Sequence, residues 1–303
     1  MELGMIGLGR MGSNMARRLL DGGHRVIVYD SVKVARTALV KEGATGAASI
    51  KELVQSLSQP RAIWLMVPAG NPTEETINKL TPELTRGDIV IDGGNSNYND
   101  SMRRAGILAK KGIIFLDVGT SGGVWGFKEG YCLMVGGDIK AFHRLEPIFR
   151  TLAPTPKTGY GYVGPSGAGH FVKMVHNGVE YGLMEAYAEG FQLLLAKEDF
   201  KLDLAKVAEI WRHGSVIRSW LLDMAELALK EDPKLERIQG YVEDSGEGRW
   251  TVEESVKLAV PLPAIALALQ MRFRSRQPDT FSDKLLAALR NQFGGHPVKE
   301  AKP

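Results

Sequence analysis

The sequence predicts an α/β protein: a doubly wound, mostly parallel sheet in the amino-terminal half, followed by an all-α domain. Three observations support this prediction. A glycine-rich turn joins a short apolar strand to a helix at the start of the chain, and strands and helices then alternate to about residue 153. After that point only helical periodicity remains. Alternating strands and helices are typical of parallel sheets that carry helices on their faces.

Length and composition are consistent with a two-domain protein. The chain has 303 residues, of which 44% are hydrophobic, a net charge of +3 and a pI near 8.8. Balanced charge argues against a dedicated nucleic-acid binder. The lone Cys132 excludes an internal disulfide and a cysteine metal cluster, and we expect it to pack as a small hydrophobe. A strand beginning at Leu3 leaves no room for a signal peptide, and no apolar run could cross a membrane, so we expect a cytoplasmic protein.

The first helix follows a glycine-rich turn directly. The stretch LGMIGLGRMGSNMARRLLDGG has a G-x-G-x-x-G spacing in the order strand, turn, helix, and a second strand, HRVIVYD, comes next. Glycines permit the tight turn and the close approach of a pyrophosphate, whose charge the helix N-terminus attracts. The sequence therefore predicts a Rossmann-like dinucleotide site, made by Gly7, Leu8, Gly9, Arg10, Met11 and Gly12. An ordinary glycine-rich turn is the alternative.

Asp30, at the end of the second strand, bears on the choice between NAD and NADP. A carboxylate there can accept hydrogen bonds from the ribose hydroxyls of NAD, and it would repel the 2′-phosphate of NADP. Lys33 and Arg36 follow shortly and could support weaker binding of NADP. We therefore predict NAD as the preferred cofactor. The alternative is that Asp30 is a helix cap or a turn residue.

The later strands of this half end in small or polar residues. We expect strands within 61–70, 87–96, 113–123 and 131–137, a short one near 44–47, and helices within 32–43, 49–57, 73–84, 98–112 and 138–153. Ligands of such sheets bind beyond the carboxyl ends of the strands. Those ends carry Val67, Pro68, Asn95 and the run Ser121, Gly122 and Gly123. Alternatively, Asn95 and Ser96 cap the next helix, and the Ser-Gly-Gly run is only a tight turn.

A segment rich in proline and glycine, residues 154–169, separates the two halves. We expect a dinucleotide-binding domain over 1–165 and a helical substrate and dimerisation domain over 166–303, which ends in a Gly/Pro-rich tail from Arg290. After a long helix from about Gly169, helices are expected around 203–214, 216–231, 250–260, 263–275 and 279–292.

The long helix contains the stretch KMVHNGVEYGLMEAYAEG, residues 173–190, with a polar stripe on an otherwise apolar surface. Lys173, Asn177, Glu180 and Tyr181 share one face by their spacing. A helix this apolar is normally covered by protein, and burial lowers a lysine pKa and raises a carboxylate pKa. Such a pair suits proton transfer near neutral pH. The alternative is an ion pair between packed helices.

Together these motifs resemble the decarboxylating 6-phosphogluconate dehydrogenases, within the wider 3-hydroxyacid dehydrogenase group. The resemblance covers nearly the whole chain and rests on GLGRMGSNMARRL, VIDGGNS, DVGTSGG, GHFVKMVHNGVEYG and RNQFGGH. It implies oxidative decarboxylation of 6-phospho-D-gluconate to D-ribulose 5-phosphate and CO2 with reduction of NAD, in the pentose phosphate pathway and gluconate utilisation. The chain resembles the short, NAD-preferring type rather than the long form.

The resemblance also implies roles for single residues. Lys173 would be the base for the 3-hydroxyl, and Glu180 the acid that protonates the enediol. Substrate-binding roles fall as follows: Asn95, His176 and Asn177 on sugar hydroxyls, Ser121, Gly122 and Gly123 on the carboxylate, Tyr181 and Arg272 on the phosphate. Arg290 and His296 would reach the site of a neighbouring subunit in a homodimer or homotetramer.

One loop departs from the long form of the family. Where that form contacts the phosphate with a lysine and a threonine, DSGEGRWT has Ser245 and Glu247. The run RFRSR, residues 272–276, could bind an anion or be a solvated basic face. His176 could be a core histidine, and Arg290 and His296 could be disordered. We predict no metal, because the chain has no convincing metal cluster and a protonated lysine can polarise the carbonyl.

Two other functions are compatible with parts of the sequence. A dehydrogenase of a smaller 3-hydroxy acid, such as hydroxyisobutyrate, would need the glycine motif, the Ser-Gly-Gly run and Lys173, but neither Glu180 nor Tyr181. A non-catalytic dinucleotide sensor would not need Lys173 together with Glu180. We expect no nucleic-acid or membrane partner for any of the three.

Overall fold

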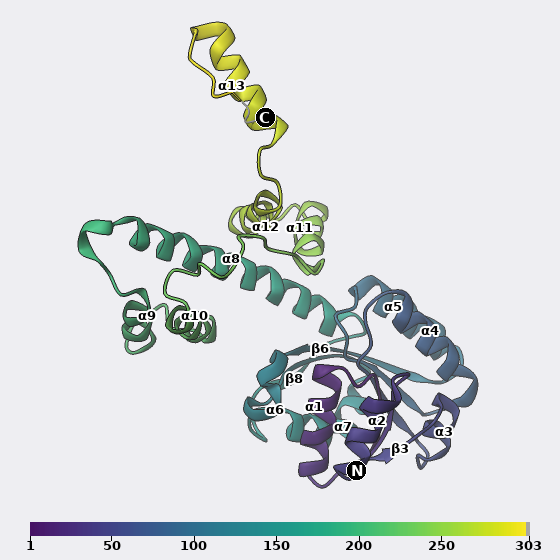
Figure 1. Cartoon of the computed structure of the whole chain (residues 1–303). Coiled ribbons are helices and arrows are strands. Elements are labelled where there is room, and N and C mark those ends of the chain that lie inside the picture. Colours follow the sequence, from purple (N-terminus) through teal and green to yellow (C-terminus); the bar gives the residue numbers. More distant parts are fainter. Residues whose placement is uncertain (301–303) are drawn as a thin grey trace. The chain divides into compact units, whose positions relative to one another are not determined.

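The computed structural model describes residues 1–300 of the chain (Figure 1). The chain divides into two compact units, one of residues 1–177 and one from Gly178 onward. The division falls within the long helix α8 (Ala168–Ala196). The domain boundary expected at residue 165 lies just before this helix and stays a prediction.

The first unit is built on an eight-stranded sheet, which confirms the predicted doubly wound architecture. The strand order is β3-β2-β1-β4-β5-β6-β7-β8, and only the β6–β7 pair is antiparallel. The strands are β1 (Glu2–Ile6), β2 (Arg25–Tyr29), β3 (Thr45–Gly46), β4 (Ala62–Leu65), β5 (Ile89–Asp92), β6 (Ile114–Ser121), β7 (Cys132–Gly137) and β8 (Tyr160–Gly164). The order runs outward from β1 in both directions, so the carboxyl ends of β1 and β4 flank the switch point where such sheets bind ligands.

Strand β8 was not expected from the sequence. It lies inside the segment rich in proline and glycine, 154–169, and pairs in parallel with β7. The side chains of Tyr160 and Tyr162 pack against the core, and the Tyr162 hydroxyl donates to the Gly137 carbonyl at 3.1 Å. Pairing with an existing strand edge therefore outweighs the low strand propensity of this glycine-rich stretch.

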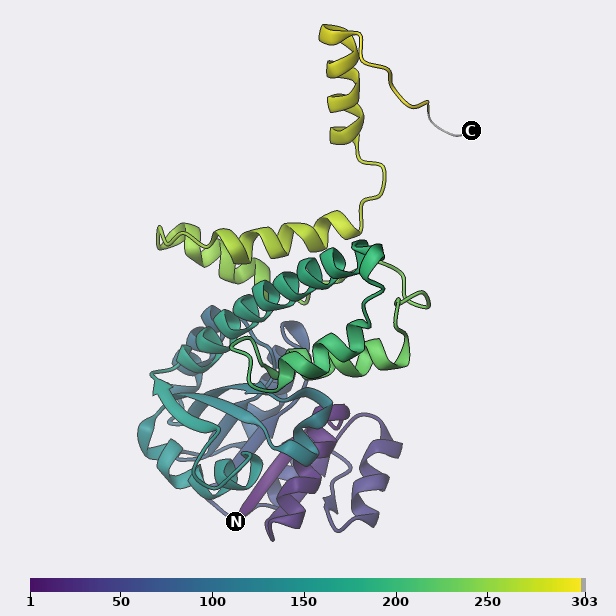
Figure 2. The ribbon, with the colours of Figure 1, turned by 90° about the vertical axis from the view of Figure 1, so that its left-hand side faces the viewer.

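Helices cover both faces of the sheet, as Figure 1 and Figure 2 show. They are α1 (Arg10–Asp21), α2 (Lys33–Lys41), α3 (Ile50–Gln55), α4 (Asn71–Leu80), α5 (Tyr98–Ala109), α6 (Gly126–Glu129) and α7 (Ile139–Leu152). One core joins α1, α2 and α7 to the sheet, and another joins α3, α4 and α5. In the central strands β1, β2, β4, β5 and β6, residues of opposite pleat enter opposite cores. Ser49 caps α3 as expected, accepting from the Glu52 N–H.

The second unit is helical throughout the part that the structure describes. After α8 come α9 (Leu204–Arg212), α10 (Trp220–Glu231), α11 (Glu247–Lys257), α12 (Pro263–Ser275) and α13 (Phe281–Gly294). Two small cores hold it together: α9 and α10 pack on the distal half of α8, and Tyr181 of α8 packs with α11 and α12. Helix α13 has no buried residue.

One expectation about burial was wrong. Cys132, at the first position of β7, is exposed rather than packed as a small hydrophobe. On helix α8, Val172, Val175, Val179 and Leu183 are each more than a third exposed. Their spacing places these four residues in one apolar stripe along the helix.

Candidate active site

The glycine loop after β1 has the geometry that a pyrophosphate needs. Gly7 has φ +92°, and a Cβ there would meet the Met66 carbonyl oxygen at 2.4 Å. A Cβ on Gly12 would meet the Gly7 carbonyl oxygen at 2.0 Å, so this glycine lets α1 pack on the turn. At Gly9, by contrast, a Cβ would have no atom within 4 Å, and no side chain caps α1. The start of α1 is therefore not capped by a side chain and has open space beside Gly9, which suits an anion.

Asp30 organises this same loop from the end of β2. Its Oδ2 accepts a hydrogen bond from the Leu8 N–H at 2.6 Å, and its Oδ1 accepts from the Val32 N–H at 2.7 Å. The turn interpretation of Asp30 is therefore confirmed, whereas the helix-cap interpretation is wrong, because the N-cap of α2 is Val32. Each carboxylate oxygen has a second lone pair, so the turn contacts leave capacity for ribose hydroxyls.

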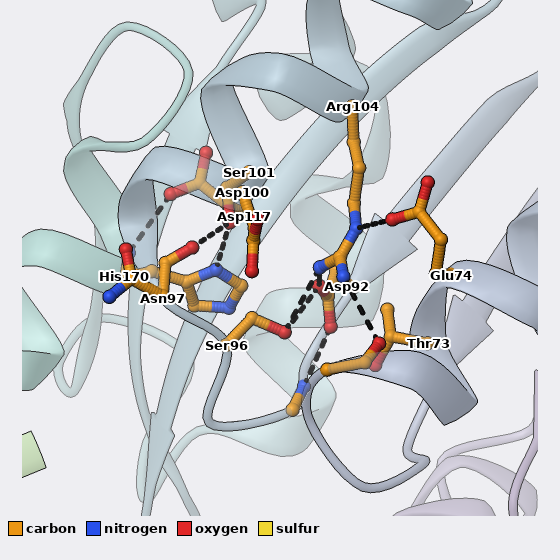
Figure 3. A network of polar contacts seen from close by, with 12 residues as sticks. Thr73, Glu74, Asp92, Ser96, Asn97, Asp100, Ser101, Arg104, Asp117 and His170 are labelled. Carbon is orange, nitrogen blue, oxygen red and sulfur yellow. Dashed lines mark hydrogen bonds and ion pairs between the residues drawn. The ribbon is translucent and has the colours of Figure 1, made fainter. Parts of the chain in front are cut away.

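The loops after β4 and β5 are tied together by a buried arginine that the sequence analysis missed (Figure 3). The Arg104 side chain of α5 is 1% exposed, and its guanidinium contacts Glu74 Oε2 at 3.0 Å and Asp92 Oδ2 at 3.3 Å. It also donates to the Gly70 carbonyl at 3.3 Å, in the loop that follows Pro68. Glu74 belongs to α4 and Asp92 ends β5, so one side chain holds both loops.

Asn95 lies at the centre of the loop after β5, and the network holds its neighbours. Asp92 accepts from the Gly94 N–H at 3.1 Å and from the Ser96 hydroxyl at 2.8 Å. Asn95 itself is exposed, while Ser96 is buried. Neither caps α5, because Asn97 does so by accepting from the Asn99 N–H. The capping interpretation of Asn95 and Ser96 is therefore wrong, and the Asn95 side chain is presented at the carboxyl end of β5.

The Ser-Gly-Gly run ends β6 and forms a tight turn. Gly122 has φ +134° and Gly123 has φ +50°, conformations that favour glycine. A Cβ on Gly122 would lie 3.1 Å from the Gly130 carbonyl, whereas at Gly123 no atom lies within 4 Å of that position. The positive φ angles fit the turn interpretation, and the open space beside Gly123 leaves room for a ligand, so the role of the run stays a prediction.

Helix α8 brings three of the predicted residues together. Lys173 is 7% exposed, and its Nζ lies 2.7 Å from Asn177 Oδ1 and 3.4 Å from His176 Nδ1. His176 Nδ1 is also 3.0 Å from Asn177 Oδ1. His176 is half-buried, with its ring nitrogen in this polar cluster, so the interpretation as a core histidine is wrong. The shared face that the spacing predicted is thereby confirmed for Lys173 and Asn177.

The backbone of β6 supports Lys173 closely. A Cβ on Gly119 would lie 2.4 Å from the Lys173 Cβ and 2.7 Å from the Gly169 carbonyl oxygen. Gly119 and Ser121 point to the same face of the strand, because side chains alternate along it. Only glycine at 119 lets the stem of Lys173 lie this close to the strand that ends in the Ser-Gly-Gly turn.

Glu180 and Tyr181 belong to the second unit, about two turns further along α8 than Lys173. Glu180 is half-buried, and Tyr181 is buried. The Arg272 guanidinium stacks on the Tyr181 ring, 3.6 Å from its centroid, and donates to the Glu243 carbonyl at 2.8 Å. Tyr181 and Arg272, the two residues expected on the phosphate, are therefore neighbours.

The loop before α11 lies against the same tyrosine. The Ser245 N–H lies 3.4 Å from the Tyr181 hydroxyl, and the Ser245 hydroxyl donates to Glu247 Oε2. Glu247 is 2% exposed, and its Oε1 is buried without a hydrogen-bond partner among the described residues. Burying a carboxylate oxygen without a hydrogen-bond partner costs free energy of folding, so Glu247 is not explained by stability alone.

The arginines of residues 272–276 do not form one basic face. Arg274 pairs with Asp283 at 2.6 Å, and Arg276 pairs with Asp244 at 2.9 Å. Asp244 also pairs with Arg249, and the hydrogen bonds from Arg249 and then Arg276 lower the Asp244 pKa to about 2. Arg274 and Arg276 therefore have carboxylate partners, whereas Arg272 adjoins Tyr181, and an anion site at Arg272 stays a prediction.

Arg290 and His296 lie apart from these residues. Arg290 is in the last turns of α13 rather than in an irregular tail, and His296 follows the end of that helix. Both are exposed, and within residues 178–300 neither side chain bonds another predicted site residue. Asn291 donates to the His296 carbonyl at 2.9 Å, so the tail folds back on α13 and the disordered interpretation is wrong.

Sequence reasoning missed two buried charged residues, Arg104 and Asp117. Both carried a signal: Asp117 interrupts the apolar strand IIFLDVG, and Arg104 lies on the buried face of α5 with Ser101 and Leu108. A charged residue at a core position has to be paired, so each marks a polar network.

Residues 1–300 include no group of three or more His, Cys, Asp or Glu side chains placed to hold a metal ion. In the same range, no helix combines the length and apolar character that a bilayer crossing requires.

Two family models match the chain in succession. Residues 2–164 match the NAD-binding domain of 6-phosphogluconate dehydrogenase, and residues 169–296 match the 6-phosphogluconate dehydrogenase C-terminal domain. Two proteins of known sequence are each 46% identical to the chain. The YqeC protein of Bacillus subtilis aligns over 99% of this chain and 100% of its own. The NAD(+)-dependent, decarboxylating 6-phosphogluconate dehydrogenase of Haloferax volcanii aligns over 98% of both.

Solved structures agree with the family models. Plasmodium falciparum 6-phosphogluconate dehydrogenase, solved in its apo form and in complex with NADP+ and 6-phosphogluconate, matches with a TM-score of 0.83 at 28% identity. The match covers 100% of this chain and 67% of that one. Mycobacterium tuberculosis 3-hydroxyisobutyrate dehydrogenase matches with a TM-score of 0.72 at 20% identity, over 90% of this chain and 92% of that one, which shows a shared fold.

Proposed function

This chain belongs to the 6-phosphogluconate dehydrogenase family, and we propose that it converts 6-phospho-D-gluconate to D-ribulose 5-phosphate and CO2 with NAD. It is an NAD-dependent, decarboxylating enzyme, as its full-length relative from Haloferax volcanii is named. The observation that carries the proposal is the hydrogen-bonded cluster of Lys173, His176 and Asn177, in which the Lys173 stem lies against Gly119.

Lys173 is proposed as the base of the oxidation. The open space at Gly9 and the uncapped start of α1 fit the pyrophosphate of NAD, and Asp30 would accept hydrogen bonds from its ribose hydroxyls. Bound NAD supplies the acceptor for the hydride that leaves the substrate. Lys173 Nζ takes the proton of the 3-hydroxyl at the same time, which offsets the positive charge that develops at that carbon. Asn177, 2.7 Å from Nζ, orients the amine.

The same lysine, now protonated, serves the decarboxylation. The oxidised substrate is a β-keto acid, and its carbonyl takes up the electrons of the breaking carbon–carbon bond as an enol. The Lys173 ammonium donates to that carbonyl oxygen and stabilises the charge that forms there. We propose that Glu180 then donates a proton to the enediol carbon, which yields the ketose.

The remaining site residues are proposed to hold the two ends of the substrate. Ser121, Gly122 and Gly123 would bind the C1 carboxylate, and Asn95 with His176 would bind hydroxyls, while Asn95, Val67 and Pro68 would contact the nicotinamide end of the cofactor. Tyr181 and Arg272 would bind the phosphate, for which the stacked guanidinium offers a planar set of donors. Arg290 and His296 would complete the site of a second copy.

The test is the rate of nicotinamide reduction with 6-phosphogluconate, run with NAD and with NADP, while CO2 release is followed. Turnover with one CO2 for each NADH supports the proposal. Reduction without CO2, or turnover of 3-hydroxyisobutyrate and not of 6-phosphogluconate, would favour the smaller 3-hydroxy acid. Cofactor binding without turnover of any 3-hydroxy acid would favour a sensor.

Replacing Asp30 with alanine is expected to shift the ratio of kcat/KM for NAD over NADP toward NADP. Loss of the carboxylate removes an acceptor for the ribose hydroxyls and a repulsion against the 2′-phosphate, and a tenfold shift corresponds to about 1.4 kcal/mol. Arg36, which donates to the Ala48 carbonyl and lies over the Tyr29 ring, is one candidate to support NADP. The double variant Asp30→Ala/Arg36→Ala should lose part of the gain. An unchanged ratio of kcat/KM for NAD over NADP would mean that Asp30 acts only as a turn residue.

Replacing Glu247 with glutamine is expected to lower the KM for 6-phosphogluconate several-fold. The amide keeps an acceptor for the Ser245 hydroxyl and removes a buried negative charge beside Tyr181, where the phosphate is proposed to bind. Gluconate, which has no phosphate, is the control substrate, and its KM should not change. An equal change in KM for both substrates would show that Glu247 does not act on phosphate binding.

We propose that two or more copies assemble. Support comes from the apolar stripe of α8, made of Val172, Val175, Val179 and Leu183, and from α13, whose Phe281, Leu286 and Phe293 are exposed. Contiguous exposed apolar faces often mark contacts between protein molecules. Sedimentation velocity should give a dimer or a tetramer, and a Leu286→Lys change should weaken it. A monomer at micromolar concentration would contradict the assembly. A cytoplasmic location is proposed from the lone cysteine and the substrate class.

A further inference from the structure

The first turn of α8 is held by a carboxylate from the sheet. Asp117 lies in the middle of β6 and is fully buried. Its Oδ1 accepts a hydrogen bond from the Gly167 N–H at 2.7 Å, and its Oδ2 accepts from the His170 N–H at 2.9 Å. Helix N-termini need acceptors for their free N–H groups, and a negative charge there also interacts favourably with the helix dipole.

Further contacts fix the same turn. His170 is 1% exposed, and its Nδ1 lies 2.6 Å from the Ser101 hydroxyl of α5, as Figure 3 shows. A Cβ on Gly136 would lie 2.8 Å from Asp117 Oδ1, and one on Gly169 would lie 2.2 Å from the Asp117 carbonyl oxygen. The first turn of α8 is therefore packed in close contact with β6.

Three alternate residues of β6 face this helix. Asp117, Gly119 and Ser121 share one side of the strand by its pleat. The first binds the helix start, the second leaves space for the Lys173 stem at 2.4 Å from a Cβ position, and the third begins the turn proposed for the carboxylate. The distance between Lys173 and the Ser-Gly-Gly turn is thus set along a single strand.

We infer that Asp117 is a positioning residue for the reaction: by anchoring the first turn of α8 to β6, it sets where the Lys173 amine lies relative to the substrate carbonyl. The inference rests on the proposed role of Lys173 as the base. A small displacement of a catalytic group reduces the chemical rate while cofactor binding is unaffected, because the dinucleotide loop belongs to β1 and α1.

The chain offers a matched control in Asp88. This carboxylate is also fully buried and also accepts from two backbone N–H groups, those of Arg61 at 2.7 Å and Thr85 at 2.8 Å. It directly precedes β5, at the amino end of the strand and away from the carboxyl ends. Asp88→Asn therefore reproduces the loss of a buried, hydrogen-bonded carboxylate without touching α8.

The experiment compares Asp117→Asn with Asp88→Asn. For Asp117→Asn we expect kcat to fall about 10- to 100-fold with an unchanged KM for NAD. Asp88→Asn should lower thermal stability and leave kcat within about twofold. Ser101→Ala removes the His170 contact, together with a 3.3 Å hydrogen bond to the Asn97 carbonyl at the start of α5. It should give a smaller fall in kcat and serves if Asp117→Asn does not fold. Equal kcat values for the Asp117 and Asp88 variants would overturn the inference, as would an unchanged kcat in Ser101→Ala when Asp117→Asn does not fold.

Two measurements on the ligand-free protein separate this inference from the proposed function. Hydrogen exchange at the Gly167 and His170 amides should accelerate in Asp117→Asn and not in Asp88→Asn. The 13Cε resonance of Lys173, assigned with Lys173→Arg, should move in the Asp117 variant alone. An unmoved resonance would overturn the inference, whereas absence of turnover by the unchanged protein would overturn only the proposed function.

Discussion

Replacing Lys173 with alanine is expected to abolish measurable turnover, with a fall in kcat of about 10³-fold or more, while NAD still binds. A positioned general base contributes about 10²- to 10⁴-fold, and in the proposed mechanism one amine serves both the oxidation and the decarboxylation. The glycine loop is separate from α8, so cofactor binding measured by fluorescence should stay the same. Steady-state kinetics and an NAD titration test the two halves of this expectation.

Asn177→Ala is the matched control for Lys173. It removes the partner of the amine, at 2.7 Å, and leaves the amine in place. We expect a smaller loss of kcat, because the base is misdirected rather than absent. Near-normal turnover in Lys173→Ala would refute the mechanism, and equal losses in both variants would show that the two side chains act as one unit.

Replacing Arg104 with alanine is expected to have the largest effect on stability, about 3–5 kcal/mol. The change leaves Asp92 buried and charged beside Ser96 without its guanidinium, and breaking a buried pair by removing one partner costs about this much. Urea unfolding measures the loss in the free energy of unfolding of the first unit within the whole chain. Since the loop with Asn95 loses its support, kcat/KM for the substrate should fall as well.

Arg103, next to Arg104 on α5, provides the control. It also pairs with Glu74, at 2.7 Å, but its side chain is 47% exposed. Its hydrogen bond is the main cause that lowers the Glu74 pKa to about 2, ahead of that of Arg104. Exposed pairs contribute little to stability, so Arg103→Ala should cost less than about 1 kcal/mol. Comparable losses in the two variants would contradict the burial argument.

Local patterns in the chain predicted most of the first unit. The glycine spacing of Gly7, Gly9 and Gly12 and the apolar strands were sufficient to predict the doubly wound sheet. The tight turn at Gly7 and the close packing at Gly12 can be made only by glycine. Strand β8 escaped prediction because its pairing with β7 is a tertiary contact that overrides a glycine-rich composition.

The candidate site was predicted in part, for a similar reason. Lys173 and Asn177 share a helix face by spacing alone, which is a local property. Arg104 and Asp117 were missed because their function is to join segments far apart in the chain, β5 with α4 and β6 with α8. The spacing of apolar residues gives no sign of such a contact, although a charged residue at a core position indicates that one exists.

Local spacing was enough to predict the family, the sheet of the first unit, the helical second unit and the face of α8 that Lys173 and Asn177 share, because each depends on patterns within short segments. The tertiary structure alone decided how Asp30 holds the glycine loop, how Tyr181 and Arg272 stack, and why Cys132 and the Val172–Leu183 stripe are exposed. Those outcomes depend on which distant segments meet, and burial and hydrogen-bond partners exist only once the chain has folded.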